Sequence, residues 1–348
     1  MDQLRQLPIP LLVWYRENAR ALPWRGTAIP YHVWLSEIML QQTRVTAVLD
    51  YYRRFLEEVP DIAALAGLPQ DQLMKLWQGL GYYSRARNLQ KAAKQIMDRH
   101  GGVFPNTYED IRALSGVGDY TAGAIASIAF GLSVPAVDGN VLRVTARIAG
   151  DSGDISTPAM KKKVARTLAE IIPLDAPGDF NQAMMELGAT VCLPNGAPLC
   201  EKCPAAGFCR AFLEGRTGEL PVKAAKKARR VEARTVYLLF HKGRVALRRR
   251  PGRGLLAGLW EYPNEPADGT DWPEKWGVAV PALEKAGTGK HIFTHIEWHM
   301  TALAGELDRP DLPEGWVWAG RTDLRDVYAV PNAFRSFEQA VLDRLGRF

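Results

Sequence analysis

Apolar residues recur every three or four positions through the first 220 residues of the chain, which is the spacing of an amphipathic helix. The ranges with this spacing are 34–56, 71–80, 84–98, 121–131, 140–149 and 159–172. Clusters of proline and glycine separate several of these ranges, as expected between helices. This part of the chain is therefore predicted to be mostly helical.

The pattern changes after residue 234. The run TVYLLF is followed by the turn sequence HKG and by RVALRRR, which together predict a β-hairpin. Shorter strand-like runs occupy 291–304 and 316–318, and a final helix is expected over 331–345. The sequence thus predicts a smaller α+β domain behind the helical module.

A basic segment joins the two parts and is predicted to be a linker over 221–234, between a module at 1–220 and a domain at 235–348. A solvated linker and a DNA-contacting linker both fit its composition, in which one acid, Glu232, stands against Lys223, Lys226, Lys227, Arg229, Arg230 and Arg234. The whole chain of 348 residues carries a net charge of +6, which favours a polyanionic partner.

The remaining composition is that of an ordinary globular protein. No stretch approaches the roughly 18 apolar residues of a membrane span, and MDQLRQLPIP does not read as a signal peptide. We therefore expect a cytoplasmic protein, associated with the nucleoid if bacterial, with reduced thiols and no membrane partner. A monomer is expected because no heptad pattern stands out.

The sequence LSGVGDYTAGA places two glycines between helical runs. Glycine permits positive φ and close backbone approach, and the amides at the start of the second helix form an anion site. Gly116, Val117 and Gly118 are therefore predicted to grip a DNA phosphate as a helix–hairpin–helix. A simple turn between helices is the alternative.

Four cysteines fall within eighteen residues with the spacing C-x7-C-x2-C-x5-C, and they are Cys192, Cys200, Cys203 and Cys209. Because disulfides are rare in the cytoplasm, clustered thiolates indicate a metal. A single C-x2-C pair in a compact loop favours a 4Fe–4S cluster, with zinc as the alternative. A structural role for the metal site, which presents Lys202 and Arg210 to a phosphate, is simpler than a role in redox catalysis.

Two carboxylates are candidate catalytic groups. Glu37 lies in the apolar run VWLSEIMLQQT, where burial would raise its pKa toward that of a neutral-pH proton donor. Asp138 lies in a VDGN turn. A surface position for Glu37 and an N-cap role for Asp138 are the alternatives.

Taken together, these motifs resemble the adenine DNA glycosylases of the MutY type, which belong to the helix–hairpin–helix superfamily. The motifs are LPWR, WLSEIMLQQT, GLGYYSRARNL, LSGVGDYTAGA, VDGN, NQAMMELGA and the four cysteines. They run in order from about residue 8 to residue 212, and the C-terminal domain resembles the family's Nudix-like second domain more loosely. The resemblance implies a six-helix part at 26–133 and an iron–sulfur part formed by 1–25 and 134–220.

The resemblance also implies the reaction. Such enzymes remove adenine mispaired with 8-oxoguanine or guanine in double-stranded DNA, after flipping the adenine out of the helix. Glu37 matches the residue that protonates the adenine ring, and Asp138 the carboxylate that stabilises or covalently traps the oxocarbenium-like sugar. The matching supporting residues are Tyr120 and Asn140, and the matching adenine pocket consists of Trp24, Arg25 and Glu186.

Tyr120 occupies the position at which the related endonuclease III-type lyases carry a lysine. The lysine amine attacks the sugar and forms a Schiff base, whereas a phenol cannot form an imine. The chain is therefore predicted to be a monofunctional glycosylase.

Recognition of the opposite base is implied at two places. Tyr82 matches an intercalating wedge beside 8-oxoguanine, and Gln42, Thr43 and Leu80 match residues next to the same lesion. The sequence HIFTHIEWH matches the family's lesion-reading hairpin at Phe293, Thr294 and His295, although serine is common at the middle position. Phosphate contacts are also suggested for Ser84, Arg85 and Arg87.

The sequence departs from the family's usual pattern in three respects. The first cysteine gap is x7 where the family usually has x6, Leu142 replaces a lysine of some members, and the acidic RExxEE helix of active Nudix hydrolases is missing. The alternative functions are a glycosylase/lyase on oxidised pyrimidines or G·T mismatches, and a non-catalytic iron–sulfur protein that binds DNA.

Overall fold

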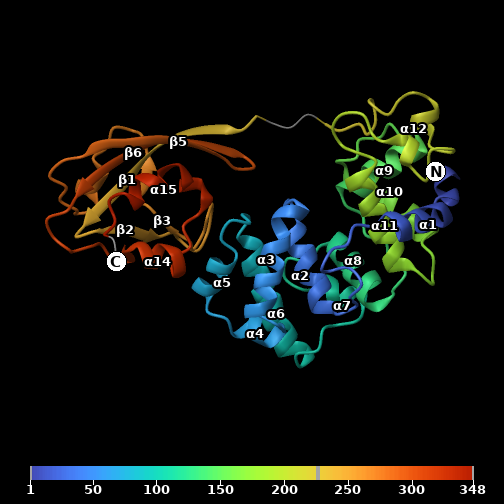
Figure 1. The fold of residues 1–348 in the computed structure, drawn as a ribbon, viewed down its shortest axis with the longest axis horizontal. Helices are drawn as coiled ribbons and strands as arrows, with labels where there is room; N and C mark the ends of the chain where they lie inside the picture. Colours follow the sequence, from blue (N-terminus) through green and yellow to red (C-terminus); the bar gives the residue numbers. More distant parts are fainter. Residues whose placement is uncertain (1, 225–227, 347–348) are drawn as a thin grey trace. The chain divides into compact units, whose positions relative to one another are not determined.

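The computed structural model describes residues 2–224 and 228–346, and its elements are drawn in Figure 1. The chain divides into two compact units. The first contains Met1–Gly67 and Arg87–Ala225, and the second contains Leu68–Ala86 and Lys226–Phe348. Lys226 and Lys227 of the predicted linker, and the outermost residues 1, 347 and 348 of the predicted domains, lie outside the described residues.

The first unit is helical, as predicted. Its α-helices are α1 (Pro8–Asn18), α2 (Pro30–Leu40), α3 (Val45–Glu58), α4 (Ile62–Gly67), most of α6 (Ser84–His100), α7 (Tyr108–Arg112), α8 (Asp119–Phe130), α9 (Gly139–Ala149), α10 (Pro158–Ala169), α11 (Pro177–Thr190) and α12 (Arg210–Leu213). Short 3₁₀ turns lie at Asp2–Gln6 and Cys200–Lys202. No helix in the described part of the chain is both long and apolar enough to cross a membrane.

The predicted helical run 34–56 is interrupted in the structure. Helix α2 ends at Leu40 and α3 begins at Val45, and Gln42 between them has a φ of 58°. Neither proline nor glycine marks this break. The interruption is instead accompanied by a tertiary contact, in which Gln41 Nε2 donates a hydrogen bond to Thr121 Oγ1 of α8 at 3.3 Å.

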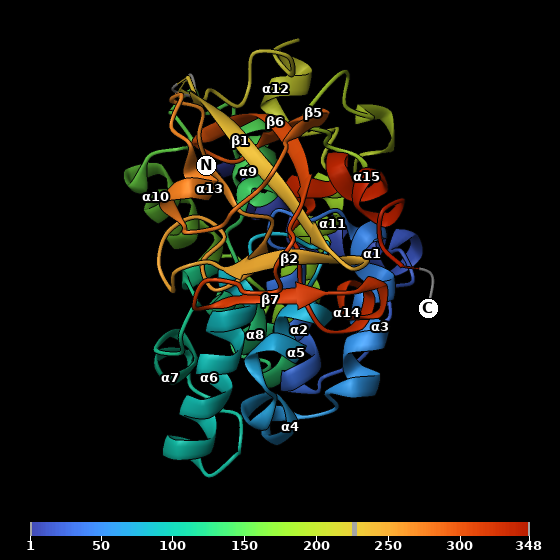
Figure 2. The same cartoon turned by 90° about the vertical axis from the view of Figure 1, so that its left-hand side faces the viewer.

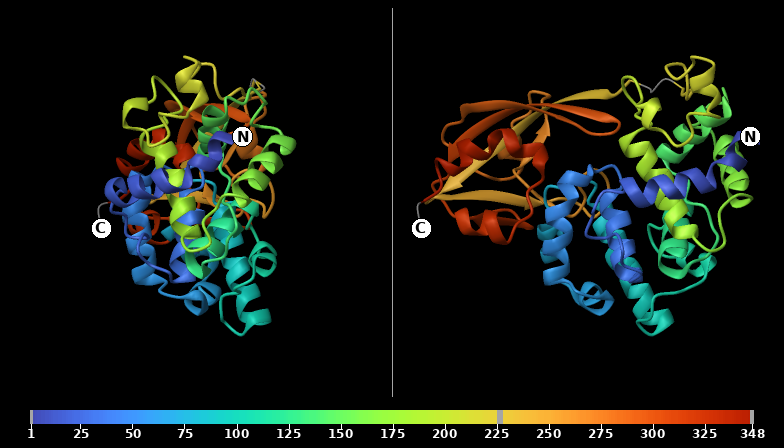
Figure 3. Two further views of the ribbon diagram at one scale, coloured as in Figure 1. Left: turned by 90° about the vertical axis from the view of Figure 1, so that its right-hand side faces the viewer. Right: turned by 45° about the vertical axis from the view of Figure 1, so that its right-hand side comes forward.

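Helix α11 lies at the centre of the first unit and packs against α1, α8 and α9. In the right-hand view of Figure 3 the yellow-green α11 and the blue α1 cross side by side. Phe180, Ala183, Met184 and Leu187 of α11 are almost fully buried in a core that also contains α9 and the N-terminal turn. This packing brings residues near 20, 37, 138 and 186 into one region.

The second unit is built on a mixed sheet with the order β3-β2-β1-β6-β5, in which β4 pairs with β1 and β7 pairs with β2. Figure 2 shows β7 alongside β2. The strands are β1 (Arg230–His241), β2 (Arg244–Arg249), β3 (Trp260–Glu261), β4 (Asn264–Pro266), β5 (Glu284–Ile292), β6 (Ile296–Glu306) and β7 (Trp316–Ala319). The first two strands form the predicted hairpin, with Phe240 opposite Val245. The last residues of the predicted linker are part of β1.

Alternate residues of β1 face two separate cores, as the pleat requires. Val236, Leu238 and Phe240 pack in one core, which includes aromatic residues of the C-terminal segment. Tyr237 and Leu239 pack in the other, beside two tryptophans of the α13 region. Helices α13 (Trp272–Lys275), α14 (Arg321–Asp326) and α15 (Glu338–Leu342) complete the domain. The expected final helix is a 3₁₀ turn at Asn332–Phe337 followed by α15.

The second unit also contains helix α5 (Gln70–Leu76) and the loop that follows it. The sequence places this segment in the helical part, yet it groups with the C-terminal domain. The overall fold class, a helical module followed by a smaller α+β domain, is confirmed.

Candidate active site and cysteine cavity

A cavity of about 670 Å³ opens in the first unit between α2, α8, α9 and α11. Its volume is in the range of ligand-binding sites. Predicted site residues from six separate stretches of sequence line it, namely Trp24, Arg25, Glu37, Gln42, Thr43, Gly116, Gly118, Tyr120, Asp138, Asn140 and Glu186.

Glu37 is the buried acid of this cavity. Its exposed fraction is only 6%, because the surrounding positions of α2 are packed in the core. Tyr120, from the first turn of α8, donates a hydrogen bond to Glu37 Oε2 at 2.5 Å. Burial raises the pKa of Glu37 to about 7, although the Tyr120 hydrogen bond opposes the shift. The charge of Asp138 raises it further, whereas Arg25 lowers it. The carboxyl group is thus poised to hold a proton near neutral pH.

Asp138 is the N-cap of α9. Its Oδ1 accepts a hydrogen bond from the Val141 amide at 2.7 Å, which is the usual N-cap contact. Its Oδ2 accepts one from Asn140 Nδ2 at 3.0 Å. Burial raises the pKa of Asp138, and these hydrogen bonds together with Arg143 oppose that shift. Capping is therefore one role of Asp138, and it also orients the side chain at the cavity wall.

Glu186 is held by two arginines. Its carboxylate accepts hydrogen bonds from Arg20 Nε and Nη2 and from Arg25 Nη2, each at 2.7 Å, and from the Arg20 amide at 3.1 Å. Burial opposes ionisation, but these hydrogen bonds lower the pKa of Glu186 to about 2. Trp24 is buried beside this group and meets the ring of Tyr52 edge-on at 5.3 Å. One wall of the cavity therefore combines a fixed carboxylate, two guanidinium groups and an indole.

The glycine hairpin connects α7 to α8. Gly116 has a φ of 76°, and a Cβ atom there would lie 2.6 Å from Asn88 Cβ. The Ser115 amide donates to Gln95 Oε1 at 2.8 Å, and Arg112 Nη1 donates to the Val117 carbonyl at 3.2 Å. Gly118 is the N-cap of α8, and Gly116 and Gly118 both line the cavity.

The residues predicted to recognise the opposite base lie in both units. Gln42 and Thr43 line the cavity of the first unit. Leu80 is buried and Tyr82 is 46% exposed, and both belong to the second unit. The tip of the β5–β6 hairpin of the same unit contains Phe293, Thr294 and His295.

Phe293, the first residue of this turn, is half-buried. Phe293 packs edge-on against Trp298 at 4.9 Å between ring centroids. Thr294 and His295 are exposed. The turn therefore exposes the Thr294 hydroxyl and the His295 imidazole to solvent, while the packing of Phe293 against Trp298 holds the hairpin.

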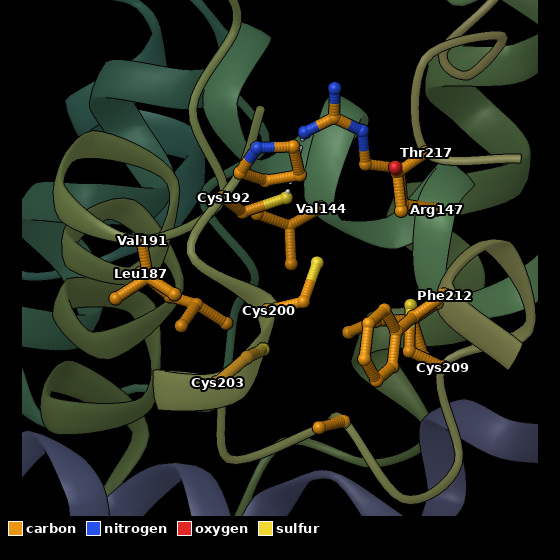
Figure 4. A pocket seen from close by; sticks show the side chains of 13 residues that line it. Val144, Arg147, Leu187, Val191, Cys192, Cys200, Cys203, Cys209, Phe212 and Thr217 are labelled. Atoms are coloured by element: carbon orange, nitrogen blue, oxygen red, sulfur yellow. Dashed lines mark hydrogen bonds between the residues drawn. The ribbon is translucent and has the colours of Figure 1, made fainter. Parts of the chain in front are cut away.

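The four cysteines surround a second cavity, which Figure 4 shows from close by. Cys192 follows α11, and Cys209 is the N-cap of α12. Arg147 Nη1 donates a hydrogen bond to Cys192 Sγ at 3.3 Å, and Val144, Leu187 and Phe212 are among the apolar residues of the wall. Among the described residues, no three His, Cys, Asp or Glu side chains are grouped as a site for a single metal ion.

Residues 35–173 match the model described as the HhH-GPD superfamily base excision DNA repair protein, and residues 235–340 match the NUDIX domain. Adenine DNA glycosylase of Mus musculus is 36% identical, over 94% of this chain and 77% of its own length. The chain belongs to the adenine DNA glycosylase family. The predicted resemblance and the enzyme class, a DNA glycosylase, are thereby confirmed.

Other members and relatives of the family agree with this assignment. Adenine DNA glycosylase of Homo sapiens is also 36% identical, over 94% of this chain and 73% of its own length. Among solved structures, a thermostable thymine-DNA glycosylase matches with a TM-score of 0.56 and 28% identity, covering 61% of this chain and 98% of the other. The helical module is thus shared with glycosylases of different base specificity.

Sequence reasoning missed two arginines that the structure places at the site of this family member. Arg20 is 166 residues from its partner Glu186, and no local signal marks it. Arg143 follows Asn140 by three residues, so both lie on one face of α9. That spacing could have identified Arg143, whose Nη2 donates to Asn140 Oδ1 at 2.9 Å and to the Gly188 carbonyl at 2.8 Å.

One further expectation differs from the geometry. Arg85 was expected at a DNA phosphate, but the residue is only 8% exposed. Its Nη2 donates to the carbonyls of Leu80 and Gly81 at 3.2 and 3.1 Å. Because a guanidinium offers a fork of donors, it satisfies two carbonyls of one loop at once.

Proposed function

We propose that this adenine DNA glycosylase removes adenine paired with 8-oxoguanine, or with guanine, from double-stranded DNA by acid-assisted hydrolysis. The observation that carries the proposal is the position of Glu37, a buried acid with a pKa of about 7, in the same cavity as Asp138. A proton donor and a carboxylate are what cleavage of an N-glycosidic bond requires. The flipped adenine would occupy the cavity of about 670 Å³.

The reaction uses the two carboxyl groups in different protonation states. Glu37 gives its proton to a ring nitrogen of adenine, and the electron pair of the glycosidic bond leaves with the base. The sugar becomes an oxocarbenium-like cation, which the carboxylate of Asp138 stabilises. A water molecule then adds to the anomeric carbon and gives its proton to the Glu37 carboxylate, which restores the acid. The hydrogen bonds from Asn140 and the Val141 amide favour the ionised form of Asp138 that this step needs.

Adenine is held by the polar wall of the cavity. Glu186 is ionised and accepts hydrogen bonds from Arg20 and Arg25, so it holds these two guanidinium groups at the cavity wall that faces adenine. Arg25 lies in the same cavity and can donate to a ring nitrogen, and Trp24 supplies an apolar surface.

Tyr120 makes the enzyme monofunctional in this proposal. Its hydroxyl donates to Glu37 and lies 3.1 Å from Met185 Sδ, and burial raises its pKa well above the ordinary value. A neutral phenol is a hydrogen-bond donor to the acid. It offers no amine for a Schiff base with the sugar.

We also propose that the opposite base is read by side chains from both units. Tyr82 would act as the wedge, and Leu80, Gln42 and Thr43 would contact the same lesion. Thr294 and its flanking residues Phe293 and His295 would contact 8-oxoguanine from the hairpin tip. The support for this is that Tyr82, Thr294 and His295 are exposed. The backbone amides of Gly116 and Gly118 would hold a phosphate at the start of α8, while the Val117 amide donates to the Leu114 carbonyl at 3.1 Å and closes the turn.

The cysteine cavity fits a 4Fe–4S cluster held by Cys192, Cys200, Cys203 and Cys209. Four thiol side chains line one cavity, which is the donor set of such clusters. Arg147 supplies a cation and a hydrogen bond at the sulfur of Cys192. When bound, the cluster would crosslink α11, the following loop and α12. Iron and acid-labile sulfide analysis of the purified protein tests this proposal, and stoichiometric zinc without iron would contradict it.

A single-turnover assay on a duplex with one A·8-oxoguanine pair tests the function. Strand breaks are expected only after alkali, because base removal leaves an intact abasic strand. Glu37→Gln and Asp138→Asn should abolish the breaks while duplex binding is retained. Breaks without alkali would show a lyase. Duplex binding without breaks, whether or not alkali is added, would show a non-catalytic DNA-binding protein. For the proposed monomer, the molar mass of the protein in solution should be that of one chain.

A further inference from the structure

Helix α5 is anchored to the C-terminal domain by its last polar residues. Lys75 Nζ donates hydrogen bonds to the Leu324 carbonyl at 2.9 Å and to the Tyr328 carbonyl at 3.5 Å. Gln78 Nε2 donates to the Val330 carbonyl at 2.8 Å, and its Oε1 accepts from Lys75 at 2.5 Å. These carbonyls lie at and just beyond the C-terminal end of α14, where a cation is favoured.

An ion pair supports the other end of the same helix. Asp71 in the first turn of α5 accepts a hydrogen bond from Arg249 Nη2 at 2.8 Å, and Arg249 is the last residue of β2. The Arg249 and Asp71 side chains are 41% and 42% exposed, so this ion pair contributes little to stability by itself. The half-buried Lys75 and Gln78 are therefore the principal polar anchors of α5.

The loop after α5 is held in an uncommon conformation. Tyr82 has a φ of 47°, which is unusual for a residue with a bulky side chain. Trp77 Nε1 donates to the Gly81 carbonyl at 3.2 Å. Arg85 donates to the carbonyls of Leu80 and Gly81, and its guanidinium lies 5.6 Å from the centre of the Tyr82 ring. Such a conformation persists only where neighbouring contacts hold it.

These contacts form one continuous path. The carbonyls after α14 hold Lys75 and Gln78, which flank Trp77 in sequence. Trp77 and Arg85 in turn hold the loop carbonyls next to Tyr82. Tyr82 is 46% exposed, so its side chain is accessible to solvent while Trp77 and Arg85 hold the loop backbone next to it.

We propose that Lys75 and Gln78 are positioning residues through which the C-terminal domain holds Tyr82 in place for selection of the base opposite adenine. The inference rests on the proposed role of Tyr82 as a wedge. Loss of the anchor frees the loop, and a small displacement of a contacting group is sufficient to weaken discrimination.

The test compares single-turnover rates of the full-length protein on A·8-oxoguanine and A·G duplexes. Lys75→Met should lower the ratio of the A·8-oxoguanine rate to the A·G rate about tenfold. Lys75→Arg keeps a donor and a cation, so it should restore most of the ratio. Lys285→Met, which changes an exposed lysine of β5 in the same unit, is the matched control and should leave the ratio unchanged. Gln78→Met provides an independent variant in case Lys75→Met is poorly folded.

A double-mutant cycle with Tyr82→Ala separates positioning from general destabilisation. If Lys75 acts through Tyr82, Lys75→Met should change the ratio by less than about twofold in the Tyr82→Ala background. Additive effects would overturn the inference, as would wild-type ratios in both anchor variants while Tyr82→Ala lowers the ratio. An unchanged ratio in Tyr82→Ala itself would overturn the wedge role, and absence of base removal by the wild-type protein would overturn the proposed function.

Discussion

The guanidinium of Arg143 determines which way the amide of Asn140 points. Arg143 Nη2 lies 2.9 Å from Asn140 Oδ1 and can only donate, so Asn140 must turn its oxygen toward Arg143. The Asn140 NH₂ group then faces Asp138 Oδ2, 3.0 Å away. The charge on Asp138 is thus supported by a donor whose orientation is set by Arg143, a residue that does not itself line the cavity.

Replacing Arg143 by methionine should therefore slow base removal. Without the guanidinium the Asn140 amide can rotate, and we expect a roughly 10–100-fold lower single-turnover rate on A·8-oxoguanine. Duplex affinity should change little. Because Arg143 Nε also donates to the Cys192 carbonyl at 2.9 Å, iron content must be measured in the same preparation. A wild-type rate in this variant would contradict the orienting role.

The pH dependence of base removal should report the proton on Glu37. The acid must be protonated to act, so the rate should fall as pH rises through about 7, the pKa that burial produces. The Tyr120 hydrogen bond favours the carboxylate and lowers this pKa. In Tyr120→Phe the falling limb should therefore move to higher pH. Single-turnover rates across the neutral range check this, and a limb that moves to lower pH would contradict it.

Glu37 should also make the folded state less stable as the pH rises from 4.5 to about 7. Its pKa rises from 4.5 to about 7 on folding, so the unfolded chain loses this proton first as pH increases. At about 1.4 kcal/mol per pH unit, the resulting cost is roughly 3 kcal/mol, developed between pH 4.5 and about 7. Glu37→Gln carries no such cost. Its unfolding free energy relative to wild type should rise between acidic and mildly alkaline pH, and an unchanged difference would contradict the burial effect.

Arg20 should contribute both to stability and to the adenine pocket. Arg20→Met removes two charge-assisted hydrogen bonds to a carboxylate that is only 1% exposed. We expect a loss of about 2 kcal/mol in the free energy of unfolding and a slower single-turnover rate. Arg5→Met is the control, because Arg5 and its partner Glu170 are exposed and 3.7 Å apart. Equal effects of the two substitutions on stability would contradict the importance of the buried pair.

The two hairpin glycines should differ in their tolerance of alanine. Gly116 has a φ of 76°, and its Cβ would lie 2.6 Å from Asn88 Cβ, whereas nothing lies within 4 Å of a Cβ at Gly118. Gly116→Ala should therefore distort the hairpin and weaken duplex binding more strongly than Gly118→Ala. Equilibrium binding at one fixed salt concentration checks this, since phosphate contacts depend on salt. Similar affinities for both variants would contradict the geometry.

Much of the fold followed from local sequence patterns. The runs 84–98, 140–149 and 159–172 correspond closely to α6, α9 and α10, because helical spacing is a property of neighbouring residues. The run 34–56 did not, since its interruption near Gln42 has no proline or glycine to announce it. The grouping of α5 with the C-terminal domain depends on Lys75 reaching carbonyls about 250 residues later, with a separation of 249 to Leu324.

The sequence by itself determined the local elements, the glycine hairpin, the thiol spacing and, through its combined motifs, the resemblance to the adenine DNA glycosylases. It also nominated Glu37 and Asp138 as a pair. Only the tertiary structure decided that Glu37 has a pKa near 7, that Arg20 joins Arg25 at Glu186, and that Arg143 orients Asn140. The physical reason is that desolvation and hydrogen bonding depend on distances through space. Those distances are set by how helices pack rather than by separation along the chain.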